Sequence, residues 1–63
     1  MKARILYKSW KGKWALEEIG GNNLFPLYYA NTKKELVELY SMNYQTVYVY
    51  KKDSHLERII ENK

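Results

Sequence analysis

Residues 32–40 constrain the fold of this chain most, because their sequence, TKKELVELY, marks the start of a helix. Thr32 is favoured at the position before a helix and Glu35 follows three residues later, so each side chain can bind a backbone N–H group at the helix entrance. Asn43 favours the left-handed conformation that ends helices. We therefore predict a helix over residues 33–42. Its apolar stripe should pack on a core and comprises Leu36, Val37, Leu39 and Tyr40.

The rest of the chain is typical of strands separated by turns. Turn-forming residues gather at positions 20–23 and 53–54. Alternating apolar and polar residues between these breaks predict five strands, over residues 4–10, 13–19, 24–29, 46–52 and 55–61. Pro26 lacks a backbone donor, so the third strand should lie at a sheet edge. We predict a single α+β domain over residues 1–63, of order β-β-β-α-β-β, in which an antiparallel sheet packs on one helix.

The turns predict how the strands of each hairpin pair. A two-residue turn at Lys11-Gly12 puts Ile5, Tyr7, Trp14 and Leu16 on one face, and Arg4, Lys8, Trp10, Lys13 and Glu17 on the other. A two-residue turn at Asp53-Ser54 gives the pairs Val47–Ile60, Val49–Arg58, Lys51–Leu56, Tyr48–Ile59 and Tyr50–Glu57. We expect the valines, backed by Ile60 and Leu56, to pack beneath the helix and the tyrosines to face outward.

The length and composition argue against an enzyme. A domain of 63 residues has a thin core and little room for a shell that holds catalytic groups in place. There is no cysteine for a disulfide or thiolate metal site, and the single histidine, His55, stands beside a turn. Gly20-Gly21 precedes no helix and so cannot cradle phosphates as nucleotide-binding loops do. We expect no catalytic, cofactor-binding or metal-binding residues.

The positive charge is concentrated at the start of the chain. The formal net charge is +4. Five basic residues precede the first acidic residue, Glu17: Lys2, Arg4, Lys8, Lys11 and Lys13. A basic hairpin of this kind is typical of a solvated face or of a surface that attracts nucleic acid or an acidic protein. Its apolar run is broken by lysines and is too short for a signal peptide or membrane span, so we expect a cytoplasmic protein.

The aromatic residues point to binding. Seven tyrosines and two tryptophans exceed what so small a core can enclose, and both residue types are enriched at interfaces. We predict a non-catalytic protein-binding module with Trp10, Tyr48 and Tyr50 as candidate anchors. One alternative is a nucleic-acid-binding protein, in which Arg4, Lys8, Lys11 and Lys13 contact phosphates and Trp10 stacks on a base. Another is a homodimer through the aromatic face or the edge at Pro26.

Two resemblances support a small binding protein. The first rests on Trp14-Ala15, Pro26, Tyr29-Ala30-Asn31-Thr32, Glu35, Glu38-Leu39 and Tyr44. This pattern resembles the small phage-encoded inhibitor of bacterial RNA polymerase, which implies a β-β-α-β protein, phage or mobile-element origin, and a host protein as partner. The inhibitor's basic residues on its last strand are replaced here by Tyr48 and Tyr50.

The second resemblance is to short bacterial domains of unknown function with a G-x-W-x-V strand, a T-K-x-E helix start and a V-x-V-x-K-x-D-G hairpin. The matching segments here are residues 12–16, 32–35 and 47–53, and Ser54 stands where that pattern has glycine. This resemblance implies a small α+β fold and brings no activity with it.

Overall fold

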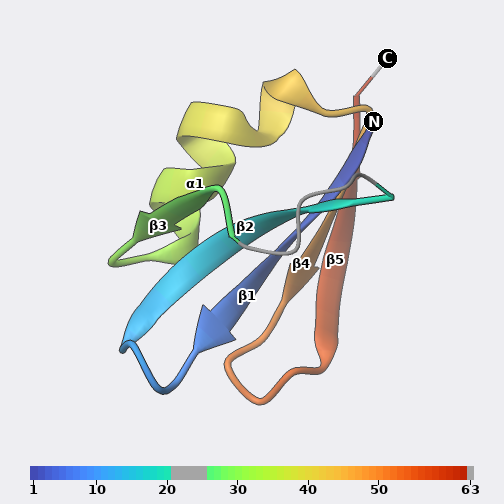
Figure 1. Cartoon of the computed structure of the whole chain (residues 1–63). Coiled ribbons are helices and arrows are strands. Elements are labelled where there is room, and N and C mark those ends of the chain that lie inside the picture. The colour runs from blue at the N-terminus through green and yellow to red at the C-terminus, as the bar shows by residue number, and fades with distance from the viewer. Residues whose placement is uncertain (21–25, 63) are drawn as a thin grey trace.

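The protein folds as one five-stranded sheet with one helix across it (Figure 1). The structure is a computed structural model, and it describes residues 1–20 and 26–62. The elements in chain order are β1 (Lys2–Lys8), β2 (Lys13–Ile19), β3 (Tyr28–Ala30), α1 (Lys33–Tyr40), the short 3₁₀ turn η1 (Ser41–Asn43), β4 (Thr46–Tyr50) and β5 (Leu56–Glu61). The predicted α+β class and element order are confirmed.

The strand order in the sheet is β3-β2-β1-β4-β5. Three neighbouring pairs are antiparallel, but β1 and β4 run parallel, so the sheet is mixed and not wholly antiparallel as predicted. Parallel strands need a long crossover connection, and here α1 carries the chain from one edge of the sheet to the far side of β1. The predicted edge position of the third strand is confirmed, although β3 has only 3 residues. Leu24 and Phe25 of the predicted strand lie outside the described residues.

The helix begins where the sequence predicts and ends earlier. The Thr32 hydroxyl oxygen accepts from the Glu35 N–H at 3.3 Å, and the same hydroxyl lies 3.4 Å from the Glu35 carboxylate. The α-helix stops at Tyr40 and continues as η1, and Asn43 is not in the predicted left-handed conformation. Leu39 is 66% exposed, so the predicted stripe is too wide by one residue. The short helix buries only Leu36 fully.

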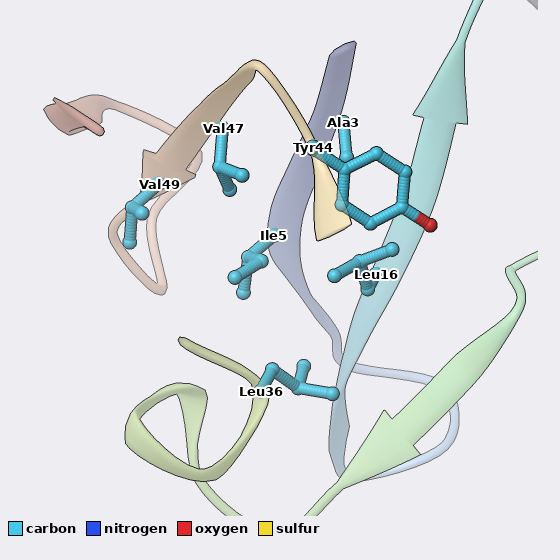
Figure 2. Packing of buried hydrophobic residues seen from close by; sticks show 7 residues of the cluster. All are labelled: Ala3, Ile5, Leu16, Leu36, Tyr44, Val47 and Val49. Carbon is cyan, nitrogen blue, oxygen red and sulfur yellow. The ribbon is translucent and has the colours of Figure 1, made fainter. Parts of the chain in front are cut away.

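The core lies between α1 and one face of the sheet (Figure 2). Its fully or nearly fully buried residues are Ala3, Ile5, Leu16, Leu36, Tyr44, Val47 and Val49. The prediction that the two valines pack beneath the helix is therefore confirmed. Alternation along the strands then places Tyr48 and Tyr50 on the opposite face.

The first hairpin has a longer loop than predicted. Lys8 pairs with Lys13, and the Lys8 carbonyl accepts from Lys11 N at 3.0 Å and Gly12 N at 2.8 Å, which closes a four-residue loop. Gly12 sits at φ +68°, a conformation that glycine adopts without strain. Pairing is shifted by two residues from the predicted register, so the predicted faces are retained. Trp10, however, lies in the loop and not on a strand.

The second hairpin matches the predicted register only at its far end. Val47–Ile60, Tyr48–Ile59 and Val49–Arg58 are paired as predicted, but a bulge then pairs Tyr50 with Leu56. The turn has three residues, 52–54, because Lys51 N donates to His55 O at 2.7 Å and Ser54 takes φ +75°. Leu56 consequently joins the tyrosine face, where it is 48% exposed, and does not back the valines. The predicted pairs Tyr50–Glu57 and Lys51–Leu56 are wrong for the same reason.

Candidate functional site

The side of the sheet that α1 does not cover is the candidate site, and we call it the open face. Strand pairing and alternation bring side chains of all five strands onto it, and those nearest its middle are Arg4, Leu6, Lys8, Ala15, Glu17, Tyr29, Tyr48, Tyr50, Leu56 and Ile59. Its centre is apolar and aromatic. Tyr48 lies beside Ile59, and Tyr50 lies beside Leu56.

The apolar residues of the open face are incompletely buried. Ile59 and Leu56 are each 48% exposed, and both tyrosines are half-buried. Ala15 is fully buried although no helix covers it, because its side chain is small and its neighbours on the sheet are large. The open face thus presents an apolar strip over β4 and β5, formed by Tyr48, Tyr50, Leu56 and Ile59, that water still reaches.

Charges border this strip on β1 and β2. Glu17 binds two cations, with Arg4 Nε 2.8 Å from Oε1 and Lys8 Nζ 2.7 Å from Oε2. Burial would raise the pKa of Glu17, but the hydrogen bonds and positive charges of Lys8 and Arg4 outweigh it and hold this pKa below its ordinary value. Glu17 is therefore ionised at neutral pH, and the three residues together carry one net positive charge.

A pocket of about 180 Å³ opens on this face between β1 and the β4–β5 turn. It is lined by Arg4, Leu6, Tyr50 and Ser54. The parallel pairing of β1 with β4 sets Arg4 beside Tyr48 and Ile5 beside Val49, and Leu6 and Tyr50 are the next residues along the two strands. Ser54, which takes the left-handed conformation in the β4–β5 turn, is one of the lining residues. The lining residues are thus one arginine, two residues that bear hydroxyl groups and one leucine.

The predicted protein-binding anchors do not all meet. Tyr48 and Tyr50 lie together on the open face, and Tyr50 lines the pocket. Trp10 is 73% exposed in the β1–β2 loop, where the Lys11 Nζ lies 5.6 Å from its ring centroid. Trp10 therefore lies in a loop, whereas Tyr48 and Tyr50 lie on β4.

The predicted nucleic-acid contacts fall into two groups. Arg4 and Lys8 are held by Glu17, which neutralises half of their charge. Lys13 is exposed at the start of β2, and the Lys11 ammonium group lies 4.7 Å from the ring centroid of Tyr29 as well as near Trp10. Positive charge therefore remains in two places, one unit at Arg4 and Lys8 and the rest at the loop end of the hairpin, where Lys11 lies beside aromatic rings.

Sequence reasoning missed Leu6, Ser54 and Leu56 as parts of this face, whereas the predicted Tyr48–Ile59 pair already placed Ile59 on it. Leu6 could have been found, because Ile5-Leu6-Tyr7 places apolar side chains on both faces of β1. Leu56 could not have been found, because the alternation of apolar and polar residues along the strand gives no sign of the bulge that turns Leu56 to the open face. Ser54 has one signal, its place in a turn where related patterns carry glycine.

The helix side of the sheet has polar contacts that tie elements together. Lys33 forms an ion pair with Glu57, which joins α1 to β5 and lowers the pKa of the Glu57 carboxyl chiefly through this hydrogen bond. The Lys33 ammonium group also lies 5.4 Å from the ring centroid of Trp14. His55 N donates to the Asp53 carboxylate at 3.1 Å within the turn. Across residues 1–20 and 26–62, no three His, Asp or Glu side chains gather as a metal site would require.

The described part of the chain contains no helix with the length and apolar character needed to cross a membrane. We found no family model that matches the chain, and no curated protein or solved structure matched it significantly.

Proposed function

We propose that this domain is a non-catalytic protein-binding module that uses its open face. The observation that carries the proposal is the apolar strip on β4 and β5, which no element of the described chain covers. Tyr48 and Tyr50 are the central anchors, and the exposed Ile59 and Leu56 extend the contact surface. Following the resemblance to the phage inhibitor, the proposal includes a host protein as the partner that the module occupies.

The composition of the strip supports a protein partner. Interfaces between proteins have an apolar and aromatic centre with a charged rim, and the open face has this order, with Arg4, Lys8 and Glu17 at its side. Aliphatic side chains such as those of Ile59 and Leu56 gain free energy when another apolar surface displaces water from them. They gain nothing comparable from phosphate groups.

The first experiment measures capture of proteins from a nuclease-treated lysate by the immobilised domain. Ile59→Ser removes an exposed apolar group from the open face, and Leu39→Ser is a matched control on the outer surface of α1. Neither change should unfold the domain, because substitutions of exposed residues usually cost within about 0.5 kcal/mol. We expect Ile59→Ser to weaken retention of a bound protein by about tenfold or more and Leu39→Ser to leave it unchanged.

Two results would contradict the proposal. Equal retention by the two variants would place any contact elsewhere. Protein captured from an untreated lysate but not from the nuclease-treated one would show that nucleic acid bridged it. Sedimentation of the purified domain tests the homodimer alternative. A dimer that dissociates in Ile59→Ser but not in Leu39→Ser would make the partner a second copy of this chain.

A second candidate function is nucleic-acid binding by the first hairpin. It is favoured by the exposed Trp10 ring at the tip of the loop, with Lys11 and Lys13 beside it. Binding through phosphates would weaken steeply with salt, with a slope of about 0.7 to 0.9 per phosphate contacted. A gel shift at low salt that Trp10→Ala abolishes would support this function. Absence of any shift with single- and double-stranded DNA and RNA would remove it.

A further inference from the structure

The Arg4 guanidinium group has hydrogen-bonding capacity that residues 1–20 and 26–62 do not use. Its Nε donates to Glu17, but among the described residues the two terminal nitrogens have no hydrogen-bond or ion-pair partner. The Arg4 side chain is 49% exposed and lines the pocket together with Tyr50 and Ser54. A guanidinium group held through Nε presents its remaining N–H groups in a fixed planar arrangement, which suits the two oxygens of a carboxylate.

The local charge fits a ligand that carries one negative charge. Glu17 satisfies one unit of charge and is shared by two cations, Arg4 and Lys8, so one positive charge is left over. A carboxylate would neutralise it. A phosphate monoester, which carries about 1.5 to 2 negative charges at neutral pH, would bring more charge than the pocket balances. The cavity of about 180 Å³ has room for a carboxyl group on a short stem, since a water molecule occupies about 30 Å³ in the liquid.

We propose that the pocket formed by Arg4, Leu6, Tyr50 and Ser54 is a subsite for a carboxylate of the protein partner, either an acidic side chain or a chain terminus. Leu6 and the Tyr50 ring contact the apolar stem, and the hydroxyl groups of Tyr50 and Ser54 donate to the carboxylate with Arg4. This subsite rests on the proposed function, because it names the chemistry by which the open face recognises its partner. The adjacent strip at Leu56 and Ile59 then accepts an apolar residue next to the acidic one.

The test uses small probes on the intact domain. N-acetyl-leucine carries the carboxylate and an apolar stem, N-acetyl-leucinamide is its neutral counterpart, and phenyl phosphate is the phosphate counterpart. Binding is followed by NMR from the backbone signals of Leu6, Tyr50 and Ser54. We expect N-acetyl-leucine to move these signals with a dissociation constant in the millimolar range and the amide to bind about tenfold or more weakly.

Two variants separate the pocket from general surface charge. Arg4→Gln removes the guanidinium group, whereas Lys13→Gln removes a positive charge of β2 that does not line the pocket. We expect Arg4→Gln to weaken N-acetyl-leucine binding about tenfold and Lys13→Gln to leave it within about twofold of the parent. Amide signals that keep their dispersion in both variants establish that the fold is intact.

The outcomes distinguish this inference from the proposed function. Equal weakening by the two variants, equal binding of acid and amide, or tighter binding of phenyl phosphate would each overturn the carboxylate subsite. None of these results touches the capture experiment with Ile59→Ser. Conversely, probe binding that depends on Arg4 would stand as a ligand site even if no captured protein depended on the open face.

Discussion

Tyr44 gives the fold a dependence on alkaline pH that follows from its surroundings. It is buried in the core, and its hydroxyl donates to Oε2 of Glu18 at 3.1 Å. Burial first, and then the hydrogen bond to Glu18 and its negative charge, raise the pKa of Tyr44 from 10.0 to about 12. The folded-state pKa lies above that of the unfolded chain. The contribution of Tyr44 to the free energy of unfolding is therefore fully present below pH 10 and is lost as the pH rises toward 12.

The size of the effect can be bounded from these two values. A difference between 10.0 and about 12 corresponds to at most about 2.7 kcal/mol, at about 1.4 kcal/mol per pH unit. Water close to so thin a domain screens part of the interaction with Glu18, so we expect a loss of about 1 to 2 kcal/mol between pH 9 and pH 12. This is a large share of the stability of a small domain.

The assay compares the parent with Tyr44→Phe by urea unfolding at a series of pH values. The chain has seven tyrosines, so an absorbance titration would mix their signals, whereas the difference between these two proteins isolates Tyr44. At neutral pH the parent should be more stable by about 1.5 kcal/mol or more, because the hydroxyl bonds a charged acceptor.

That advantage should shrink as the pH rises. Glu18→Gln should reduce the pH dependence without abolishing it, because it keeps an acceptor and removes the charge while Tyr44 stays buried. Parallel curves for the parent and Tyr44→Phe would refute the reasoning.

Three further changes test the fold. Thr32→Ala should lower the free energy of unfolding by about 1 kcal/mol, because an amide at the start of α1 loses its acceptor, and an unchanged urea midpoint would contradict this cap. Ser54→Gly should raise it by about 0.5 to 1 kcal/mol, because glycine relieves the φ of +75°, whereas Asp53→Gly in the same turn should not. Val49→Ala should lower the free energy of unfolding by about 2 to 3 kcal/mol, because burial is lost and a cavity forms. The exposed Leu39→Ser should lower it by about 0.5 kcal/mol or less. Similar thermal midpoints for these two variants would show that the sheet faces are assigned the wrong way round.

The parts of the fold that could be predicted are those that depend on neighbouring residues. The cap at Thr32 and the alternation of Val47 and Val49 with two tyrosines act over a few positions, so the helix start and the sheet faces follow from the sequence. Turn lengths did not follow, because they depend on which carbonyl accepts the closing hydrogen bonds, as Lys8 does in the first hairpin. The parallel pairing of β1 with β4 depends on the path of the whole chain.

The candidate site was predictable only in outline. Tyr48 and Tyr50 were placed on an outward face by alternation, and the structure confirms that face. The pocket beside them joins Arg4 of β1 to Ser54 of the last turn, residues 50 positions apart, and no local pattern connects them. Glu17 was predicted to share a face with Arg4 and Lys8, but its role in dividing the basic charge became visible only in the register of the first hairpin.

The central position of β1 has a consequence for how the chain folds. One side of β1 pairs with β2 through a short hairpin. Its other side pairs with β4, which comes much later in the chain, so that Ala3 and Val47 are paired although 44 positions separate them in the sequence. Closing so long a loop is entropically costly, and it precedes most of the contacts that repay it. The first three strands alone would leave Ile5 uncovered on one side and a bare strand edge beside it. We expect a fragment of residues 1–45 to remain unfolded until a peptide of residues 46–62 is added, with both pieces gaining structure together.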